Sequence, residues 1–542
     1  MSQLLAKHPL SNSVRRDYTD PIMTTCDLEF RRRVTRIPPH GLGLSVDVYT
    51  PALFELVREL DGSGLPYGYL EIFRAPTTVL EAVRKGLPST LLEYHAEGIW
   101  VTQPELETDY PLEAELAETV AQLRALGSHW LNHECASKQI AGYSFGTYLP
   151  PLFTRASAAL TAENVTLVQQ RLDDLSAAPG RPGPLLLLEL PPLTYFGAGD
   201  LPVAEFFRRL TERTACGLVL DVGHLWTVYC YMGEWRRRSM EAFVEEFLAA
   251  FPLERVVQVH LAGLACHPDD VPSIPSDARP CPRWIDAHAA PIPAVLYEML
   301  EQVLAHPDLK SLEGVGLEVD TKPVSLILSE FERVRARFGK LVERLSQRGD
   351  PGSLAFPHAP PEPSSVEGGL SIETRSLREE YELYARTVTG LSSADLPTLF
   401  RSFGTETESL NAYLEAYLPH EILVWGGDLR AMFPETCRAL DAHRIPLAGF
   451  VHYWFREART VLSPYDFFLL KTERFCAYVE EVLPSAACTA TREAAELRAA
   501  YENVKCDASC VPRPLDHSRG GEPVEPQVRD ALSLSKGAMS GD

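Results

Sequence analysis

The stretch PLLLLELPPLTYFGAGDLPVAEFFRRLTERTACGLVLDVGH (Pro184–His224) contains the unit that decides the fold. A run of leucines ends at Glu189, and a second apolar run, Cys216–Leu220, ends at Asp221. Between them, Val203–Thr214 carries apolar residues at three- and four-residue spacing, which predicts an amphipathic helix. Two buried strands joined by a helix are the parts of a parallel strand–helix–strand unit.

The same unit repeats between Gly41 and Gly339. The apolar runs are Gly41–Val46, Gly68–Phe73, Ser89–Tyr94, Ser128–Asn132, Pro184–Leu188, Cys216–Leu220, Arg255–Val259 and Gly314–Leu317. The segments with helical spacing are Leu53–Leu60, Leu112–Leu126, Ala162–Leu175, Val203–Thr214, Met240–Ala250, Ile292–Leu304 and Val324–Phe338. Eight such units predict an α/β fold, a (β/α)8 TIM barrel. No glycine-rich phosphate loop follows the first run, which counts against a dinucleotide-binding sheet.

The length of 542 residues predicts more than one domain. We expect an N-terminal extension that is an extended lead-in (1–38), the barrel (39–340), a Pro/Gly/Ser-rich linker (341–372), a mostly helical domain (373–505) and a disordered polar tail (506–542). The helical segments of the second domain are Leu377–Val388, Ser393–Phe400, Glu406–Tyr417, Leu429–Leu440, Leu447–Ala458 and Pro464–Val482.

The composition excludes several classes of partner. The net charge of −23 leaves no basic surface for nucleic acid or an anionic membrane. No apolar run is long enough to span a bilayer, and the first residues lack the apolar core of a signal peptide. The 11 cysteines are an odd number scattered over a long chain, which favours reduced thiols over a disulfide scaffold. We therefore expect a cytoplasmic protein.

Acids and imidazoles follow the last six apolar runs. They are His95, His133, Glu189, Asp221 with His224, His260, and Glu318 with Asp320. A parallel barrel gathers the carboxyl ends of its strands on one face, so these side chains are expected to converge. Asp286 and His288 lie at Asp-x-His spacing in the loop after the seventh run.

This residue set predicts a metal site. So many imidazoles and carboxylates exceed the ligand set of one catalytic zinc. A mixed nitrogen and oxygen set suits two or three borderline metals such as iron, manganese or zinc, with carboxylates bridging them. The absence of thiolates among the candidates argues against an iron–sulfur cluster.

The order and sequence motifs of these segments resemble those of the DUF692 family, the multinuclear non-haem iron-dependent oxidative enzymes (MNIO). The methanobactin-biosynthesis oxidase is one type of this family. The resemblance covers roughly Pro39–Gly339. Its pieces include GLGL (Gly41–Leu44), LEI (Leu70–Ile72), NHE (Asn132–Glu134), AGYSFGTYLPPLFT (Ala141–Thr154), NVTLVQQRL (Asn164–Leu172), LLLLE, LDVGH, HLAG, the WIDAH box and GLEVD.

The resemblance implies an enzyme and a ligand set. The metal ligands carried over are His95, His133, Glu189, Asp221, His224, His260, Asp286, His288 and Glu318, and Asp320 is the expected catalytic residue. The implied cofactors are two or three iron ions in mixed Fe(II)/Fe(III) valence, with O2 as co-substrate. The implied reaction is oxidation of cysteine residues in a ribosomally synthesised precursor peptide, a step of natural-product biosynthesis.

The chain departs from the family pattern at two places. Leu190 follows the glutamate of the fifth strand, where the family commonly has Asn, so a supporting hydrogen bond is expected to be lost. Gly223-His224 follows the aspartate of the sixth strand, where many members are Asn-rich; this variant keeps a ligand.

The carboxyl-terminal domain resembles the DUF2063-like partner proteins of such enzymes. The similar segments are LYARTVTGLSSADLPTLFRSFG, LEAYLPHE and FVHYWFREA. A fused partner would tether peptide recognition to catalysis and raise the effective concentration of substrate. If this domain does not recognise the precursor peptide, a separate partner protein is expected to do so.

Two other functions stay open from the residues alone. One is a xylose-isomerase-like barrel, an isomerase, epimerase or endonuclease that uses divalent metals at the same strand ends. The other is a metal- or peptide-binding scaffold without catalysis. The metal content of the purified protein separates these possibilities from an iron-dependent oxidase.

Overall fold

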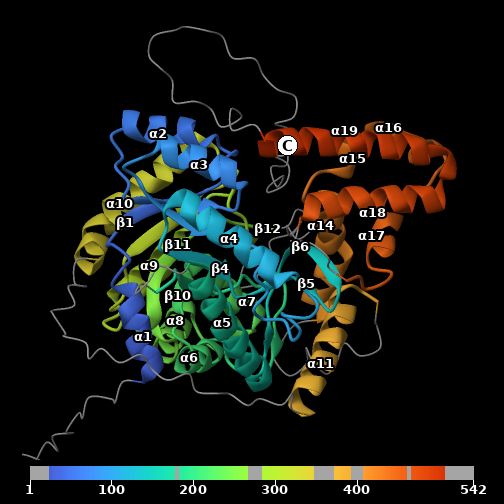
Figure 1. Ribbon diagram of the computed structural model, residues 1–542. Coiled ribbons are helices and arrows are strands. Elements are labelled where there is room, and N and C mark those ends of the chain that lie inside the picture. Colours follow the sequence, from blue (N-terminus) through green and yellow to red (C-terminus); the bar gives the residue numbers. More distant parts are fainter. Residues whose placement is uncertain are drawn as a thin grey trace, which may run out of the picture.

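The computed structural model describes residues 24–176, 182–266, 284–346, 372–391, 407–460 and 466–506. At its centre is a closed barrel of parallel strands in the order β1-β14-β11-β10-β8-β4-β3-β2 (Figure 1). The strands are β1 (Gly41–Val46), β2 (Tyr69–Phe73), β3 (Leu91–His95), β4 (Trp130–Glu134), β8 (Leu185–Glu189), β10 (Gly217–Asp221), β11 (Val256–Leu261) and β14 (Gly314–Glu318). The predicted TIM barrel is confirmed.

Helices surround the barrel. They are α2 (Leu53–Gly62), α3 (Thr77–Gly86), α4 (Leu112–Leu126), α5 (Arg155–Ser176), α6 (Val203–Arg213), α7 (Val222–Tyr231), α8 (Met240–Ala250), α9 (Ala294–Ala305) and α10 (Val324–Ser346). In α6 the buried residues Val203, Phe206 and Leu210 recur at helical spacing. Apolar faces of these helices pack against the strands, and α7 is buried on all sides, so the main core is the layer between barrel and helices.

The amino-terminal extension contains a helix that we did not predict. α1 (Thr25–Val34) begins with a capping box between Thr24 and Asp27. Its Phe30 packs with Trp130 and Val219, which point into the barrel. The expected extended lead-in is therefore wrong for this part, because the amino end of the barrel exposes apolar side chains that need a cover.

Short strands extend from the carboxyl end of the barrel. β5 (Ser137–Ile140) and β6 (Tyr143–Leu149) form an antiparallel hairpin, here called the β5–β6 hairpin. β12 (Leu264–Cys266) pairs with β13 (Trp284–Asp286), and this pairing holds the loop that carries Asp286. A further pair joins β7 (Leu152–Phe153) to β9 (Ala198–Gly199).

The carboxyl-terminal region is helical, as predicted. Its helices are α11 (Ile372–Val388), α13 (Thr407–Ala412), the π-helix η4 (Tyr413–Tyr417), α14 (Leu418–Leu423), α15 (Leu429–Met432), α16 (Pro434–Ala442), α17 (Gly449–Trp454), α18 (Phe467–Val482) and α19 (Ala487–Cys506). α14 and α18 pack on β6, α11 on α5 and β5, and α19 on α3 (Figure 1). None of the helices that the structure describes is long and apolar enough to cross a membrane.

Parts of the expected organisation lie outside the described residues. These parts are residues 1–23, most of the linker 341–372, the predicted helix Ser393–Phe400 and most of the tail 506–542. α10 continues to Ser346, so the helical structure of the barrel region extends past the expected boundary at residue 340.

Candidate metal centre

Six barrel strands carry a buried acid or imidazole at the carboxyl end of the barrel, at the last position of the strand or, in β11, one residue before it. These residues are His95 on β3, Glu134 on β4, Glu189 on β8, Asp221 on β10, His260 on β11 and Glu318 on β14. The register places Glu134 beside Glu189 and Asp221 beside His260. Residues from distant parts of the sequence thus form one compact polar cluster.

Four of these side chains are close enough to share one cation. Glu189, Asp221, His260 and Glu318 each offer a ligand atom within 4.8 Å of the other three. Nδ1 of His260 lies 3.2 Å from Oε1 of Glu189 and 3.2 Å from Oε1 of Glu318. One imidazole and three carboxylates make a complete ligand set for a borderline metal.

Two further groups overlap with this one. His95, Glu134 and Glu189 form one group within 4.8 Å, and Glu71, His95 and Glu318 form another. Glu189 and Glu318 therefore belong to two groups each. A carboxylate shared in this way can bridge neighbouring metal ions.

The loop residues approach the cluster from the cavity side. Nε2 of His288 lies 2.9 Å from Oε2 of Glu318 and 3.1 Å from Oδ2 of Asp286. Nε2 of His224 lies 3.6 Å from the same Oδ2. Asp320, the expected catalytic residue, contacts Nδ1 of His288, so it orients this imidazole.

Hydrogen bonds to the backbone orient two more imidazoles. Nδ1 of His95 lies 3.2 Å from the carbonyl oxygen of Ala96, and Nδ1 of His224 lies 2.5 Å from that of Leu190. Each ring thereby turns Nε2 toward a carboxylate of the cluster, since Nε2 of His95 is 3.6 Å from Oε2 of Glu189. An acceptor at Nδ1 selects the tautomer that leaves Nε2 able to bind a metal.

The structure brings together all the predicted ligands except His133. Its Nε2 accepts the backbone N–H of Ile99 at 3.0 Å, and its Nδ1 lies 2.7 Å from the carbonyl oxygen of Glu134. The structure therefore places His133 outside the cluster, contrary to its prediction as a ligand. β4 extends to Glu134, and alternation along a strand sends His133 outward while Asn132 and Glu134 face the cluster.

Sequence reasoning missed Glu71 and Glu134. The signal for Glu71 is a carboxylate in the middle of the buried strand YLEIF, where burial is costly without a partner. The signal for Glu134 is alternation along the strand, because residues two apart face the same side. Glu134 lies two residues after Asn132, which donates a 2.5 Å hydrogen bond to Glu189.

Burial and close charges shift the pKa values in opposite directions. Burial raises the pKa of Asp221 to about 7, although the charge of His224 opposes this rise. Burial acts to raise the pKa of Glu189 as well, but the charge of His260 together with the hydrogen bonds from His260 and His95 brings that pKa to about 2. Buried carboxylates that compete for protons in this way are the groups that a divalent cation stabilises.

Unsatisfied polar atoms test whether a metal fits. Oε1 of Glu189, Oδ2 of Asp221, Nε2 of His224 and Nδ1 of His260 are buried without a hydrogen-bond partner among the described residues. Buried polar groups are normally paired. Ligand atoms of this kind, facing one another, fit two or more cations.

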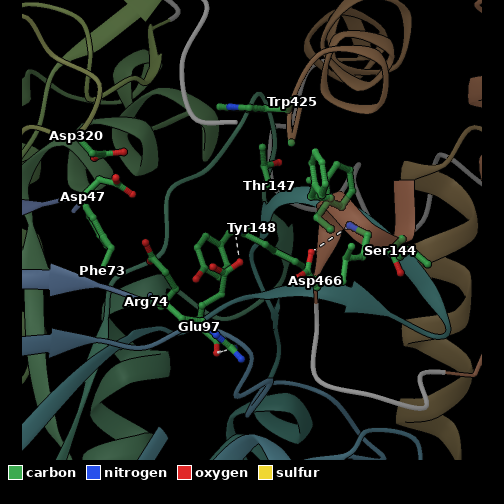
Figure 2. Close-up of a pocket in the computed structure, with 18 of the residues that line it drawn as sticks. Asp47, Phe73, Arg74, Glu97, Ser144, Thr147, Tyr148, Asp320, Trp425 and Asp466 are labelled. Carbon is green, nitrogen blue, oxygen red and sulfur yellow. Dashed lines mark hydrogen bonds and ion pairs between the residues drawn. The ribbon is translucent and has the colours of Figure 1, made fainter. Parts of the chain in front are cut away.

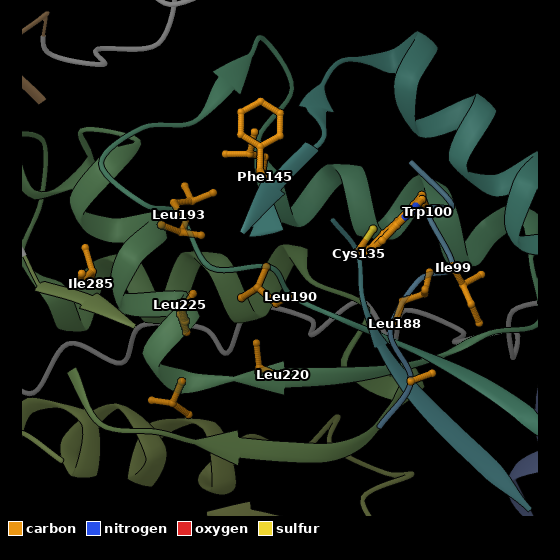
Figure 3. Close-up of a cluster of buried hydrophobic side chains, with 14 of the residues drawn as sticks. Ile99, Trp100, Cys135, Phe145, Leu188, Leu190, Leu193, Leu220, Leu225 and Ile285 are labelled. Atoms are coloured by element: carbon orange, nitrogen blue, oxygen red, sulfur yellow. The ribbon is translucent and has the colours of Figure 1, made fainter. Parts of the chain in front are cut away.

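Leu190 occupies an apolar environment next to the site. Its side chain is fully buried among Leu188, Leu220, Leu225 and other apolar residues (Figure 3). The support for the His224 ring comes from the backbone carbonyl of Leu190. The orientation of His224 therefore does not depend on an amide side chain at position 190.

A cavity of about 1210 Å³ lies over the cluster. Its walls come from both parts of the chain, with Phe73 and Asp320 on the barrel and Trp425 and Asp466 in the helical region (Figure 2). The candidate ligands His95, Glu134, Asp286, His288 and Glu318 also line it. A molecule in the cavity can therefore reach the cluster.

Comparisons with known proteins identify a similar family. The model of a family described as RiPP precursor modification enzyme MbnB/TglH/ChrH matches residues 80–338. A UPF0276 protein of Bordetella bronchiseptica is 30% identical over 231 residues, which are 42% of this chain and 70% of that protein. A UPF0276 protein of Streptomyces avermitilis is 26% identical over 274 residues, which are 48% of this chain and 49% of that protein.

Solved structures match this chain at lower similarity. Endonuclease IV from Thermus thermophilus is 18% identical with a TM-score of 0.35, covering 55% of this chain and 99% of that one. A D-psicose 3-epimerase is 13% identical with a TM-score of 0.31, covering 56% of this chain and 96% of that one. Similarity at this level bears on neither substrate nor reaction.

Proposed function

This chain belongs to the DUF692 (MNIO) family of MbnB/TglH/ChrH-like RiPP precursor modification enzymes, and on that premise we propose that it oxidises cysteine residues of a ribosomally synthesised peptide. The proposed cofactors are two or three iron ions, and O2 is the proposed oxidant. The observation that carries this proposal is the group of Glu189, Asp221, His260 and Glu318 beneath a cavity large enough for a peptide segment.

The proposed ligand sets follow two of the three groups of side chains and, for the third ion, the contacts of Asp286 with His224 and His288. One iron would be held by Glu189, Asp221, His260 and Glu318. A second would be held by His95 and Glu134 with shared Glu189, and a third by His224, Asp286 and His288. Bound iron would supply one-electron redox chemistry toward O2, for which mixed imidazole and carboxylate ligation is suited.

The protein residues would position the substrate and the ligands. His95, Glu134 and Glu318 line both the cluster and the cavity, so a thiol in the cavity reaches the ligand positions directly. A soft thiolate is a good ligand for an open iron position. We propose that Asp320 is a positioning residue, because its contact with Nδ1 directs Nε2 of His288 to the cluster.

The helical region is proposed to hold the peptide next to the cluster. Tyr417, Trp425 and Phe467 of this region line the cavity that the candidate ligands also line. Recognition fused to the catalytic barrel would raise the effective concentration of the peptide. This arrangement supports the view that the helical region serves as the recognition partner, and a separate partner protein is the alternative.

We propose a cytoplasmic location for this reaction. Seven cysteines are free thiols, and five of these are at least partly shielded by the core, namely Cys135, Cys216, Cys230, Cys437 and Cys476. Reduced thiols are the usual state of cysteine in that compartment.

Metal analysis after anaerobic purification tests the proposed cofactor. We expect two or three irons per chain, and we expect Glu189→Ala to lower this number because Glu189 belongs to two groups of ligands. Glu212→Gln, on the exposed face of α6, is the matched control and should keep the wild-type content. Stoichiometric zinc or manganese without iron would contradict the oxidase and favour an isomerase-like barrel.

The substrate requires a second experiment. A short cysteine-containing peptide encoded beside the gene should change mass when it is incubated with the iron-loaded enzyme and O2. The change should disappear under anaerobic conditions and with the Glu189→Ala enzyme. A mass change that does not depend on O2 would contradict the proposed oxidation.

A further inference from the structure

His260 is oriented differently from the other imidazoles of the cluster. His95, His224 and His288 each have Nδ1 next to an acceptor and direct Nε2 at the cluster. In His260 it is Nδ1 that lies 3.2 Å from two carboxylates of the four-residue group. The Nε2 atom of His260 points to the opposite side, into the barrel interior, where it needs a different acceptor.

Glu71 is the carboxylate on that side. Its Oε2 lies 3.4 Å from Nε2 of His260, and both side chains are fully buried. Its other oxygen, Oε1, accepts a 2.6 Å hydrogen bond from Oγ of Ser45, the residue beside it on β1. The hydroxyl therefore fixes the carboxylate while one oxygen stays available for His260.

The barrel leaves space for this pair through a glycine. Gly316 is the register partner of His260 on β14, and a Cβ there would lie 3.3 Å from the imidazole ring. The same Cβ would lie 2.8 Å from Oη of Tyr69, which shares the interior. The absence of a side chain at position 316 lets the imidazole lie between Glu71 and the four-residue group.

We propose that Glu71 is a positioning residue that accepts the Nε2–H of His260 and thereby commits Nδ1 to the metal. A carboxylate behind a ligating imidazole selects its tautomer and increases its basicity. Removal of such a partner typically lowers metal affinity by about 10–100-fold. This inference rests on the proposed metal centre and assigns a role to a residue outside the predicted ligand set.

Direct ligation by Glu71 is the competing role. One of its oxygens lies within 4.8 Å of ligand atoms of His95 and Glu318. Glu71→Gln separates the two roles, because an amide oxygen still accepts the N–H of His260 while its NH2 donates to Ser45. An amide is a poor replacement for a metal-binding carboxylate, so a ligand role predicts the loss of metal.

The experiment compares the wild type with Glu71→Gln, Glu71→Ala and a matched control. The control is Glu93→Gln, which changes the fully buried register partner of Glu71 on β3, whose contact is Gln258. Affinity is measured by anaerobic titration with Fe2+ and, separately, with Co2+, whose visible absorption reports the ligand set. Iron-loaded samples are compared by Mössbauer spectroscopy.

The expected results distinguish the roles. Glu71→Ala should bind about 10–100-fold more weakly. Glu71→Gln should keep the wild-type number of metals with a shifted spectrum, and Glu93→Gln should match the wild type. Loss of one metal from Glu71→Gln, or wild-type affinity in Glu71→Ala, would overturn the inference. Absence of iron binding in the wild type would overturn the proposed function, and the Co2+ series would still test Glu71.

Discussion

Glu421 joins the helical region to the β5–β6 hairpin, and replacing it should change how stability depends on pH. Its Oε1 accepts the backbone N–H of Gly146 and, at 3.1 Å, that of Thr147, and its Oε2 accepts Oγ1 of Thr147 at 3.1 Å. Burial raises the pKa of this carboxyl to about 7, although these hydrogen bonds and the charge of Lys138 lower it.

The sign of the effect follows from proton binding. A carboxyl with a raised pKa binds its proton more tightly in the folded protein than in the unfolded chain. The resulting stabilisation is complete below the ordinary value of 4.5 and is lost as the pH rises through about 7. At about 1.4 kcal/mol per unit, the loss for Glu421 amounts to about 3 kcal/mol of unfolding free energy.

Glu421→Gln should remove this loss. The amide oxygen can accept both backbone N–H groups, and its NH2 can donate to Oγ1 of Thr147, as a protonated carboxyl would. The variant should therefore match the wild type near pH 5 and exceed it by up to about 3 kcal/mol at pH 8. Glu421→Ala should be less stable at every pH, because two buried N–H groups lose their acceptor.

Urea unfolding of the metal-free protein between pH 5 and pH 8 measures this difference. The carboxylates of the metal centre titrate equally in wild type and variant, so the difference between the two curves isolates Glu421. Glu415→Gln, an exposed glutamate on the preceding helix η4, should follow the wild-type curve. Parallel curves for wild type and Glu421→Gln, or a Gln variant that is weaker at pH 8, would refute the reasoning.

Three other changes have defined outcomes. His133→Phe should lower the unfolding free energy by about 1–3 kcal/mol, since the backbone N–H of Ile99 loses its acceptor. The metal content measured by elemental analysis should stay the same, and a loss of metal would make His133 a ligand after all. Gly43→Ala should cost about 1–3 kcal/mol in thermal unfolding because the added Cβ overlaps the Tyr69 ring, and an unchanged melting temperature would contradict this packing. Chelation of the metal should lower the melting temperature, and Fe2+ should restore it. A ligand at 100 times its Kd adds about 2.7 kcal/mol to the unfolding free energy. Equal melting temperatures with and without metal would argue against a site of that affinity.

The barrel could be predicted because its signals are local. Each strand is a short apolar run and each helix has its own spacing, so PLLLLE alone indicates a buried strand that ends in Glu189. The same holds for Asp221, which ends β10, and for His260, the penultimate residue of β11. Convergence of these residues follows from the parallel topology without knowledge of any contact.

His133 was expected to face the cluster because the predicted run, Ser128–Asn132, stops two residues before the end of β4. The expected run began at Ser128, but Oγ of Ser128 donates to the carbonyl oxygen of Trp130 in a turn, and β4 begins at Trp130 and continues to Glu134. Because side chains alternate along a strand, the end point decides which of two neighbours faces inward. Composition cannot distinguish His133 from Glu134, since both are polar and both lie at the same barrel end.

The sequence by itself determined the barrel, the set of strand ends that carry acids and imidazoles, and the helical character of the carboxyl-terminal region. Only the tertiary structure decided that Glu71 faces His260, that Glu134 and not His133 lies in the cluster, and that Trp425 of the helical region borders the same cavity as the cluster. The physical reason is the distance along the sequence between the residues that interact. Strands and helices depend on neighbours within a few residues, whereas a site depends on the register in which distant strands pair and on which surfaces then bury one another.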